Sequence, residues 1–256
     1  MSWSVDDDLR LALELADIAD AITMQAFRRA DLRVETKPDL TPVTEADRGV
    51  EQALRARIES ARRGDAVVGE EFGATGESAR RWFLDPIDGT KNFVRGIPVF
   101  ATLIGLEQDG EVVAGVCSAP ALRARWWASR GGGAFADGRR IAVSGVAQLG
   151  DAQLSYDSVP GFEEEGLGAQ FMSLARRCWR SRGFGDFWSH VLVAEGAVDV
   201  AVEPAVSPWD LAPLKVIVEE AGGRFTDLSG AARIDGGSAV SSNGLLHDDV
   251  LAALRR

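Results

Sequence analysis

Two carboxylates three residues apart, Asp85 and Asp88, are the side chains of this sequence with the most evident chemistry. They follow the apolar residues 82–84, and Pro86 and Gly89 interrupt the run with residues that are typical of turns. Carboxylates held this close repel each other unless a cation or a proton lies between them, and ligands made only of oxygen suit Mg²⁺. The segment therefore predicts a magnesium site at the exposed carboxyl end of a buried strand. An ordinary Asp/Gly turn between two strands is the alternative.

Two other segments place acids in a comparable context. Glu70 and Glu71 follow the strand-like residues 66–68, so a shared sheet would bring them to the same edge as Asp85. Asp210 stands in the first turn of a predicted helix, where the helix dipole favours an acid even without a catalytic role.

The elements that must position these acids begin with two helices. Residues 6–30 contain neither Pro nor Gly and show an amphipathic pattern with acids at the start and arginines at the end. Thr44 is a candidate N-cap of the second helix, with Asp47 three positions later. Closely spaced strand-like runs follow and predict an antiparallel or mixed sheet: 66–68, 82–84, 101–106, 112–117 and 125–128.

From about residue 150 the pattern changes to alternating strands and helices. The predicted strands cover 154–158, 198–202 and 239–241, and the predicted helices cover 163–177, 187–195, 209–221 and 245–254. We therefore predict an α/β fold of layered α+β type. It divides into a metal-binding half, residues 1–145, and an α/β half, residues 146–256, packed as one compact unit.

Composition excludes several classes of function. The chain of 256 residues has a formal charge of -11 and no basic stripe, which argues against a polymeric nucleic acid as partner. No stretch approaches the ~20 apolar residues of a membrane span, and the acidic residues 6–8 do not resemble a secretory signal. Cys117 and Cys178 are too few for a disulfide framework. We expect a cytoplasmic protein that does not bind membranes.

Other candidate motifs have structural explanations. His190 and His247 are the only histidines, and no zinc-binding spacing surrounds them, so we expect structural roles. Glycines 131–133 superficially resemble a dinucleotide loop but predict a turn between strands, because a preceding strand and a following helix are not evident.

Taken together, the acidic motifs resemble those of the inositol monophosphatase superfamily, which comprises Mg²⁺-dependent phosphomonoesterases. The resemblance covers nearly the whole chain and depends on segments 69–71, 85–90, 209–210 and 220–223 in that order. It implies the αβαβα architecture of that family and hydrolysis of a small-molecule phosphate monoester by direct attack of water. It also implies a homodimer.

The resemblance further implies the roles of individual residues. Glu70, Asp85 and the carbonyl of Ile87 would hold one Mg²⁺, and Asp85, Asp88 and Asp210 would hold a second. A third, looser ion would depend on Glu70, and Mn²⁺ could substitute for Mg²⁺. The catalytic residues would be Asp47, Glu70 and Thr90, with Asp47 and Thr90 orienting the attacking water, and the phosphate would be bound at Asp88, Gly89 and Thr90.

The choice of alcohol depends on less specific segments. Residues 37–44, 85–98 and 118–127 look like the actinobacterial type of histidinol-phosphate phosphatase, an enzyme of histidine biosynthesis. Asp186 and Glu203, together with Asp210, would then bind the substrate, since carboxylates suit its ammonium and imidazole groups.

Several alternatives remain open at this stage. Trp209 or Trp188 could stack on the imidazole, but Trp188 is equally suited to core packing, and Asp186 could be a helix N-cap. The enzyme could instead be an inositol-1-phosphate or broader sugar-phosphate phosphatase. A phosphate-ligand sensor on the same fold is the non-enzymatic alternative.

Overall fold

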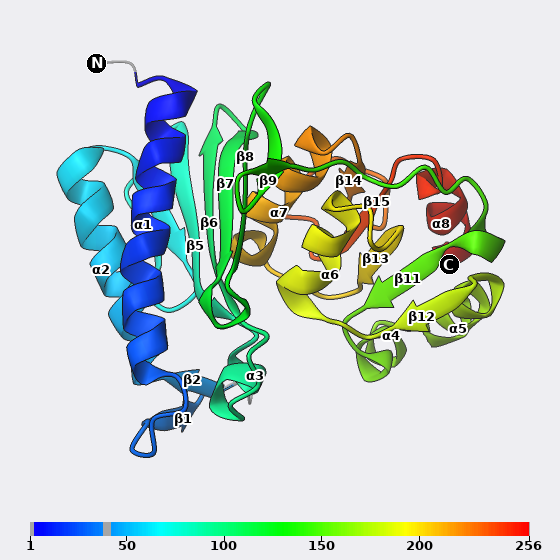
Figure 1. Ribbon diagram of the computed structural model, residues 1–256, viewed down its shortest axis with the longest axis horizontal. Coiled ribbons are helices and arrows are strands. Elements are labelled where there is room, and N and C mark those ends of the chain that lie inside the picture. Colours follow the sequence, from blue (N-terminus) through cyan, green and yellow to red (C-terminus); the bar gives the residue numbers. More distant parts are fainter. Residues whose placement is uncertain (1–2, 38–41, 256) are drawn as a thin grey trace.

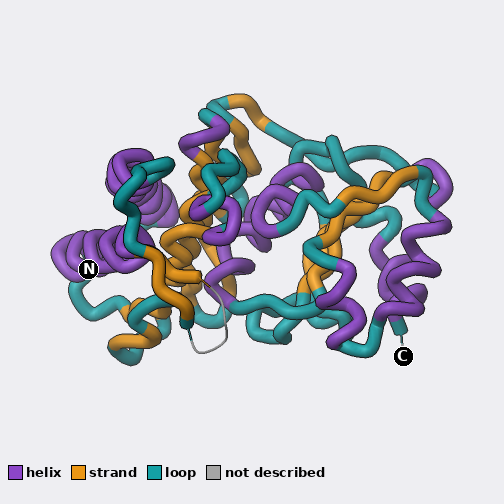
Figure 2. Tube along the Cα trace, turned by 90° about the horizontal axis from the view of Figure 1, so that it is seen from below, coloured by secondary structure: helices purple, strands orange, loops and turns teal. Residues whose placement is uncertain are grey.

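The computed structural model describes residues 3–37 and 42–255, and its helices lie in three layers separated by two sheets (Figures 1 and 2). The two ends of the described chain lie at opposite ends of the long axis (Figure 1). The helices are α1 (Val5–Ala26), α2 (Glu45–Ala61), α3 (Thr90–Val94), α4 (Val159–Glu164), α5 (Gly168–Arg177), α6 (Asp186–Ala194), α7 (Pro208–Glu220) and α8 (His247–Leu254).

The first sheet has eight strands in the order β10-β9-β8-β7-β6-β5-β3-β4. Only β3 and β5 run parallel; the other described neighbours are antiparallel, as the short turns predict. The strands are β3 (Ala66–Gly69), β4 (Gly73–Thr75), β5 (Arg80–Asp88), β6 (Ala101–Gln108), β7 (Glu111–Ala119), β8 (Ala124–Ser129), β9 (Gly133–Ala136) and β10 (Arg139–Arg140).

The second sheet has five strands in the order β12-β11-β13-β15-β14, with β11 parallel to both of its neighbours. Its strands are β11 (Gln153–Tyr156), β12 (Arg180–Arg182), β13 (Val200–Glu203), β14 (Arg224–Thr226) and β15 (Ala239–Ser242). A small separate pair, β1 (Val34–Thr36) and β2 (Pro42–Thr44), precedes α2.

Apolar packing explains the order of the layers. Helices α1 and α2 cover the outer face of the first sheet, α6 and α7 lie between the sheets, and α4, α5 and α8 cover the second sheet (Figure 1). The predicted α/β layered architecture is therefore present. The first sheet lies within residues 66–140 and the second within 153–242, and the division at residue 145 stays a prediction.

Two glycines let α7 approach the first sheet closely. A Cβ atom added to Gly105 of β6 would lie 2.7 Å from Cβ of Ala212, and one added to Gly115 of β7 would lie 2.6 Å from Cα of Pro213. The backbone of α7 thus rests directly on two neighbouring strands. This contact fixes the distance between the first sheet and α7, the helix that carries Asp210.

Several predicted boundaries were wrong. The strand predicted to stop before Asp85 continues to Asp88, with an irregular register between the two acids, and Asp85 is buried rather than exposed. The single helix predicted over 163–177 is two helices, because Gly166 adopts a φ of 69° between them. Helix α1 ends at Ala26 instead of continuing to residue 30.

The remaining expectations about composition can be compared with the described part of the chain. Cys117 is buried, Cys178 is half-buried, and both thiols are free. Glycines 131 and 132 form the turn between β8 and β9, as predicted, and Gly133 begins β9. Among the described residues, no helix has both the length and the apolar composition needed to cross a bilayer.

Candidate active site

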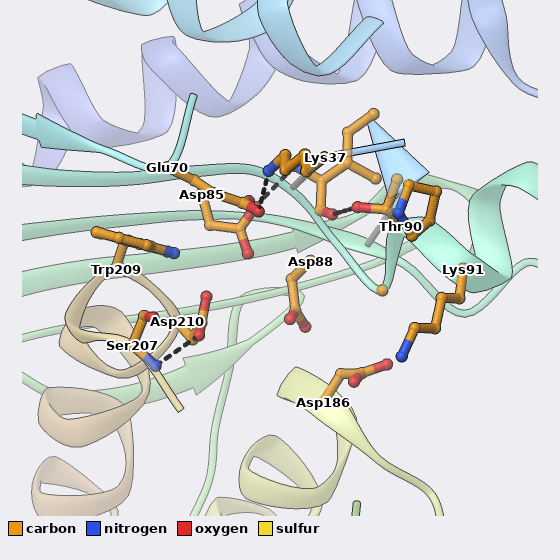
Figure 3. Close-up of a pocket in the computed structure, with 13 residues that line it drawn as sticks. Lys37, Glu70, Asp85, Asp88, Thr90, Lys91, Asp186, Ser207, Trp209 and Asp210 are labelled. Carbon is orange, nitrogen blue, oxygen red and sulfur yellow. Dashed lines mark hydrogen bonds and ion pairs between the residues drawn. The ribbon is translucent and has the colours of Figure 1, made fainter. Parts of the chain in front are cut away.

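A cavity of about 500 Å³ opens where β3 and β5 end and α7 begins (Figure 3). Strands β3 and β5 belong to the first sheet, and α7 belongs to the helical layer between the two sheets. The cavity therefore lies between the first sheet and that layer. Its lining residues are Lys37, Pro42, Glu70, Asp85, Ile87, Asp88, Gly89, Thr90, Lys91, Asp186, Ser207, Trp209 and Asp210.

Three carboxylates meet in this cavity. Asp85, Asp88 and Asp210 each offer an oxygen that lies within 4.8 Å of the oxygens of the other two. Figure 3 shows the side chains of these residues converging from β5 and from the first turn of α7. Residues separated by more than a hundred positions thus form one acidic cluster.

The irregular end of β5 determines how its two acids are presented. Asp85 is 2% exposed, and its Oδ1 accepts a hydrogen bond of 2.9 Å from the backbone amide of Ile87. The hydroxyl of Thr102 on β6 donates to the carbonyl of Pro86 at 2.7 Å, which satisfies a backbone group that the interrupted ladder leaves free. Asp85 and Asp88 can therefore both face the cavity.

Asp210 is held by the start of its own helix. Ser207 is the N-cap of α7, and its backbone amide donates to Oδ2 of Asp210 at 2.9 Å in a capping box. The sequence Ser207-Pro208-Trp209-Asp210 carries the local signal for this arrangement. Ser207 also lines the cavity, although its role was not predicted.

Asp88 makes a contact that joins the two parts of the chain. Its Oδ2 accepts a hydrogen bond of 2.7 Å from the backbone amide of Phe187, in the first turn of α6. The N-cap of α6 is Gly185, which has no side chain to accept a hydrogen bond. Asp186 follows it with a φ of 45°. The alternative that Asp186 is the N-cap was therefore wrong, and Asp88 supplies the acceptor instead.

Burial and mutual repulsion raise the pKa of every acid in the cluster. For Asp85 burial is the largest cause, followed by the charges of Glu70, Asp88 and Asp210. For Asp88 burial is again first, followed by the charges of Asp186 and Asp210. Burial raises the pKa of Asp210 to about 7, although the hydrogen bond from Ser207 opposes the shift. Such a cluster of oxygen ligands, short of positive charge, fits a divalent cation.

Glu70 lies at the same edge, as the parallel pairing of β3 with β5 requires. Gly69 is level with Leu84, and the amide of Glu70 donates to the carbonyl of Leu84 at 3.2 Å. Its Oε1 lies 2.6 Å from Nζ of Lys37, and Oε1 of Glu71 lies 2.5 Å from the same nitrogen.

Lys37 is a cavity residue that the sequence did not identify. Burial alone would lower the pKa of its ammonium, but the two carboxylates more than offset this and raise it. The contact joins residues more than thirty positions apart, so no local spacing signals it. Residues 38–41 of the family-like segment 37–44 lie outside the described residues.

Thr90 and Asp47 lie together, as the family resemblance implies. The hydroxyl of Thr90 is 2.9 Å from the carbonyl of Ile87 and 3.4 Å from Oδ1 of Asp47. The other oxygen of Asp47 accepts hydrogen bonds from the amide and hydroxyl of Thr44, in the predicted capping box at the start of α2. Burial raises the pKa of Asp47, and the bonds from Thr44 oppose this.

The residues predicted to select the alcohol are placed differently from one another. Asp186 and Trp209 line the cavity, and Figure 3 shows the ammonium of Lys91 directed toward Asp186. Burial, then the charges of Glu203 and Asp157, raise the pKa of Asp186 to about 7, while Lys91 acts in the opposite direction. Glu203 is buried behind this wall and does not line the cavity.

Trp188 is half-buried against the core between the sheets and beside Phe184, with ring centroids 5.1 Å apart. It does not line the cavity, which favours the core-packing alternative.

Comparisons with known proteins extend over almost the whole chain. The model of the inositol monophosphatase family matches residues 5–256. A histidinol-phosphatase from Mycobacterium tuberculosis is 58% identical over 97% of this chain and 98% of its own length, and one from Streptomyces coelicolor is 51% identical over 98% and 97%. The solved structure of an inositol monophosphatase from Zymomonas mobilis has 35% identity, a TM-score of 0.88 and 99% coverage of both chains. This likeness confirms the predicted fold class.

Proposed function

The chain belongs to the inositol monophosphatase family, and from this premise we propose that it hydrolyses L-histidinol phosphate to L-histidinol and inorganic phosphate. The family and its phosphomonoesterase activity were both predicted from the acidic motifs. One observation carries the proposal: a single cavity holds the cluster Asp85, Asp88 and Asp210 together with the carboxylate of Asp186.

Members of the family use Mg²⁺ and related divalent cations, and the acidic cluster is suited to them. We propose that Asp85, Asp88 and Asp210 hold such an ion, and that Glu70 and the carbonyl of Ile87 contribute to a second. Two or three Mg²⁺ ions, with Mn²⁺ as a substitute, are the expected complement. When bound, the ions would offset the carboxylate charge, polarise the phosphate and make water more acidic.

Thr90 and Asp47 are suited to orienting the attacking water. When the Thr90 hydroxyl donates a hydrogen bond to the carbonyl of Ile87 or to Asp47, its lone pairs are free to accept a hydrogen bond from water. A hydrogen bond from Thr44 fixes the orientation of the Asp47 carboxylate. Its raised pKa makes this carboxylate a stronger proton acceptor.

The phosphate would lie beside the start of α3. Gly89 precedes the helix with a φ of 81°, and the amides of Gly89 and Thr90 are at its positive end. A Cβ atom at Gly89 would lie 3.1 Å from the carbonyl oxygen of Val99, so a larger residue would disturb this turn as well as strain its backbone.

The opposite wall suits a cationic alcohol. Asp186 has neither a hydrogen bond nor an ion pair to its carboxylate among the described residues, and Glu203 adds negative charge behind it. An ammonium group or a protonated imidazole would compensate this charge, whereas a neutral polyol would not. Trp209 offers an aromatic surface for the imidazole.

Two wider expectations belong to the same proposal. As in the family resemblance, we propose that the enzyme is a homodimer, which light scattering of the purified protein would test. We also propose that it acts in the cytoplasm as part of histidine biosynthesis.

A turnover panel in Mg²⁺ tests the function. We expect the highest kcat/KM for histidinol phosphate, compared with inositol-1-phosphate, fructose-1,6-bisphosphate and 3′-phosphoadenosine 5′-phosphate. Equal or faster turnover of inositol-1-phosphate would refute the choice of alcohol, and failure to hydrolyse any of the four esters would favour a sensor. Asp186→Asn should reduce kcat/KM for histidinol phosphate selectively, because it removes the charge and keeps the shape.

A further inference from the structure

His190 occupies a position that connects the substrate wall with the second sheet. It is fully buried on α6, four residues and therefore about one helical turn after Asp186. Its Nδ1 lies 2.6 Å from Oγ of Ser241 on β15, and its Nε2 lies 3.5 Å from Oε2 of Glu203 on β13. One imidazole therefore contacts two neighbouring strands of the sheet.

The neighbours of the ring determine where its proton lies. A carboxylate only accepts hydrogen bonds, so a bare Nε2 facing Glu203 would place two lone pairs against each other in a buried site. Ser241 can either donate or accept. The favoured arrangement has the Ser241 hydroxyl donating to Nδ1 and the Nε2–H directed at Glu203.

In this arrangement the distance between Nε2 of His190 and Oε2 of Glu203 is longer than a normal hydrogen bond. Nε2 has no hydrogen-bond partner within bonding distance among the described residues, although it is buried and points toward the carboxylate. A 3.5 Å separation is longer than a good N–H···O bond, yet the attraction between the N–H and the carboxylate is strong where water is excluded. Glu203 therefore has an N–H donor on its buried side.

Glu203 in turn acts on the cavity. It is 5% exposed and ends β13, and its charge is the largest contribution after burial to the raised pKa of Asp186. Glu203 thus contributes negative potential behind Asp186.

We propose that His190 is a positioning residue for substrate selection, whose Nε2–H holds Glu203 behind Asp186 so that the cavity wall favours the cationic alcohol. The proposal rests on histidinol phosphate being the substrate. His190, Ser241 and Glu203 resemble a catalytic triad only in composition, because Ser241 is fully buried and neither Ser241 nor His190 lines the cavity.

The test compares His190→Gln, whose side-chain amide can still donate to Glu203, with His190→Leu, which cannot. KM and kcat are measured for histidinol phosphate and for p-nitrophenyl phosphate, which has no cationic group, and the affinity for L-histidinol is measured by calorimetry. We expect His190→Leu to raise KM for histidinol phosphate by about tenfold, with kcat within about twofold and p-nitrophenyl phosphate unaffected. His190→Gln should keep KM within about threefold of wild type.

Two further variants are included so that the result does not depend on whether His190→Leu folds. Ser241→Ala removes the hydroxyl that fixes the tautomer and should raise KM for histidinol phosphate by a few fold. His247→Gln, at a buried histidine on α8 away from the cavity, should leave the ratio of the two KM values unchanged.

The outcomes separate the two proposals. If wild type hydrolyses histidinol phosphate no better than the other esters, the proposed function fails. If wild type is selective but His190→Leu and His190→Gln behave alike, or both esters lose activity equally, His190 is only structural. Should His190→Leu fail to fold, unchanged selectivity in Ser241→Ala together with weakened L-histidinol binding in His190→Gln overturns the inference.

Discussion

The carboxylate of Asp88 caps helix α6 by accepting a hydrogen bond of 2.7 Å from the amide of Phe187. The same side chain belongs to the acidic cluster with Asp85 and Asp210. One residue of the first sheet therefore both completes the proposed metal site and holds the helix that carries Asp186 and His190. The proposed metal site and the proposed substrate wall therefore meet at this contact.

Asp88→Asn should separate the charge of this residue from its cap. The amide oxygen can still accept from Phe187, so we expect an intact fold and a loss of kcat of several orders of magnitude. Because the charged form of Asp88 is disfavoured by burial and by Asp186 and Asp210, the metal-free variant should be more stable than wild type at pH 8. Urea unfolding in EDTA measures this difference.

The pH dependence of that gain has a definite sign. The folded-state pKa of Asp88 lies above its unfolded value, so the gain is present at pH 8 and declines as the acid becomes protonated at lower pH. Asp88→Ala is the control for the cap and should be about 1 kcal/mol less stable than Asp88→Asn. A variant that keeps near-normal kcat would contradict the metal role.

Thr90→Val should remove the hydroxyl between Asp47 and Ile87 while keeping the shape of the side chain. We expect kcat to fall by about 10²–10³ with little change in KM, because the orientation of water is lost and substrate contacts remain. Thr90→Ser retains the hydroxyl and should recover most of the rate. Steady-state kinetics of the pair decide, and equal rates for both variants would exclude the role.

Gly115→Ala should test the contact between α7 and the first sheet. The added methyl would lie 2.6 Å from Cα of Pro213, so backbone has to move, and we expect a loss of about 2–3 kcal/mol in urea unfolding. Weaker Mg²⁺ binding by calorimetry should accompany it, since α7 carries Asp210. Gly49→Ala is the matched control: it lies within α2 with open space around it and should gain about 0.5–1 kcal/mol.

His247 should make the fold sensitive to mild acid. Burial, then the nearby charge of Arg224, lowers its pKa from 6.5 to about 4. The unfolded chain therefore takes up a proton first, and the stability from this group is full above about pH 6.5 and lost as pH falls toward 4, by up to about 3 kcal/mol. The neutral ring is bridged between Thr226 and Ser242, both at 2.9 Å.

Histidine NMR gives a direct measurement, because the chain has two histidines. The signal absent from His247→Gln identifies His247, and it should remain in the neutral form at pH 5. Titration of that signal near pH 6.5 in the folded protein would show that the prediction is wrong.

The parts of the candidate site that depend on local signals could be predicted from the sequence. Thr44 and Asp47 form the capping box that their spacing predicts, and Glu70 meets Asp85 because two parallel strands end together. Capping and strand ends are set by neighbouring residues, so a single sequence indicates them. The catalytic and ligand roles assigned to these residues stay predictions.

The parts that were missed depend on contacts across the fold. Lys37 reaches Glu70 and Glu71, and Asp88 caps α6, although no spacing connects these pairs. Glu203 was predicted at the substrate wall, but it is buried behind it with His190. Such relationships follow from how layers stack, which periodicity does not determine.

The close contact of α7 with Gly105 and Gly115 also bears on how the protein forms. Asp85 lies on β5, in a sheet whose strands can assemble early in synthesis. Asp210 joins Asp85 only after the chain has passed residue 220 and α7 has docked on this sheet. Pairings this distant in sequence form slowly, and domains synthesised first tend to fold first. The emerging first sheet would therefore expose the apolar face that α7 later covers, and this surface would need protection from aggregation until α7 docks.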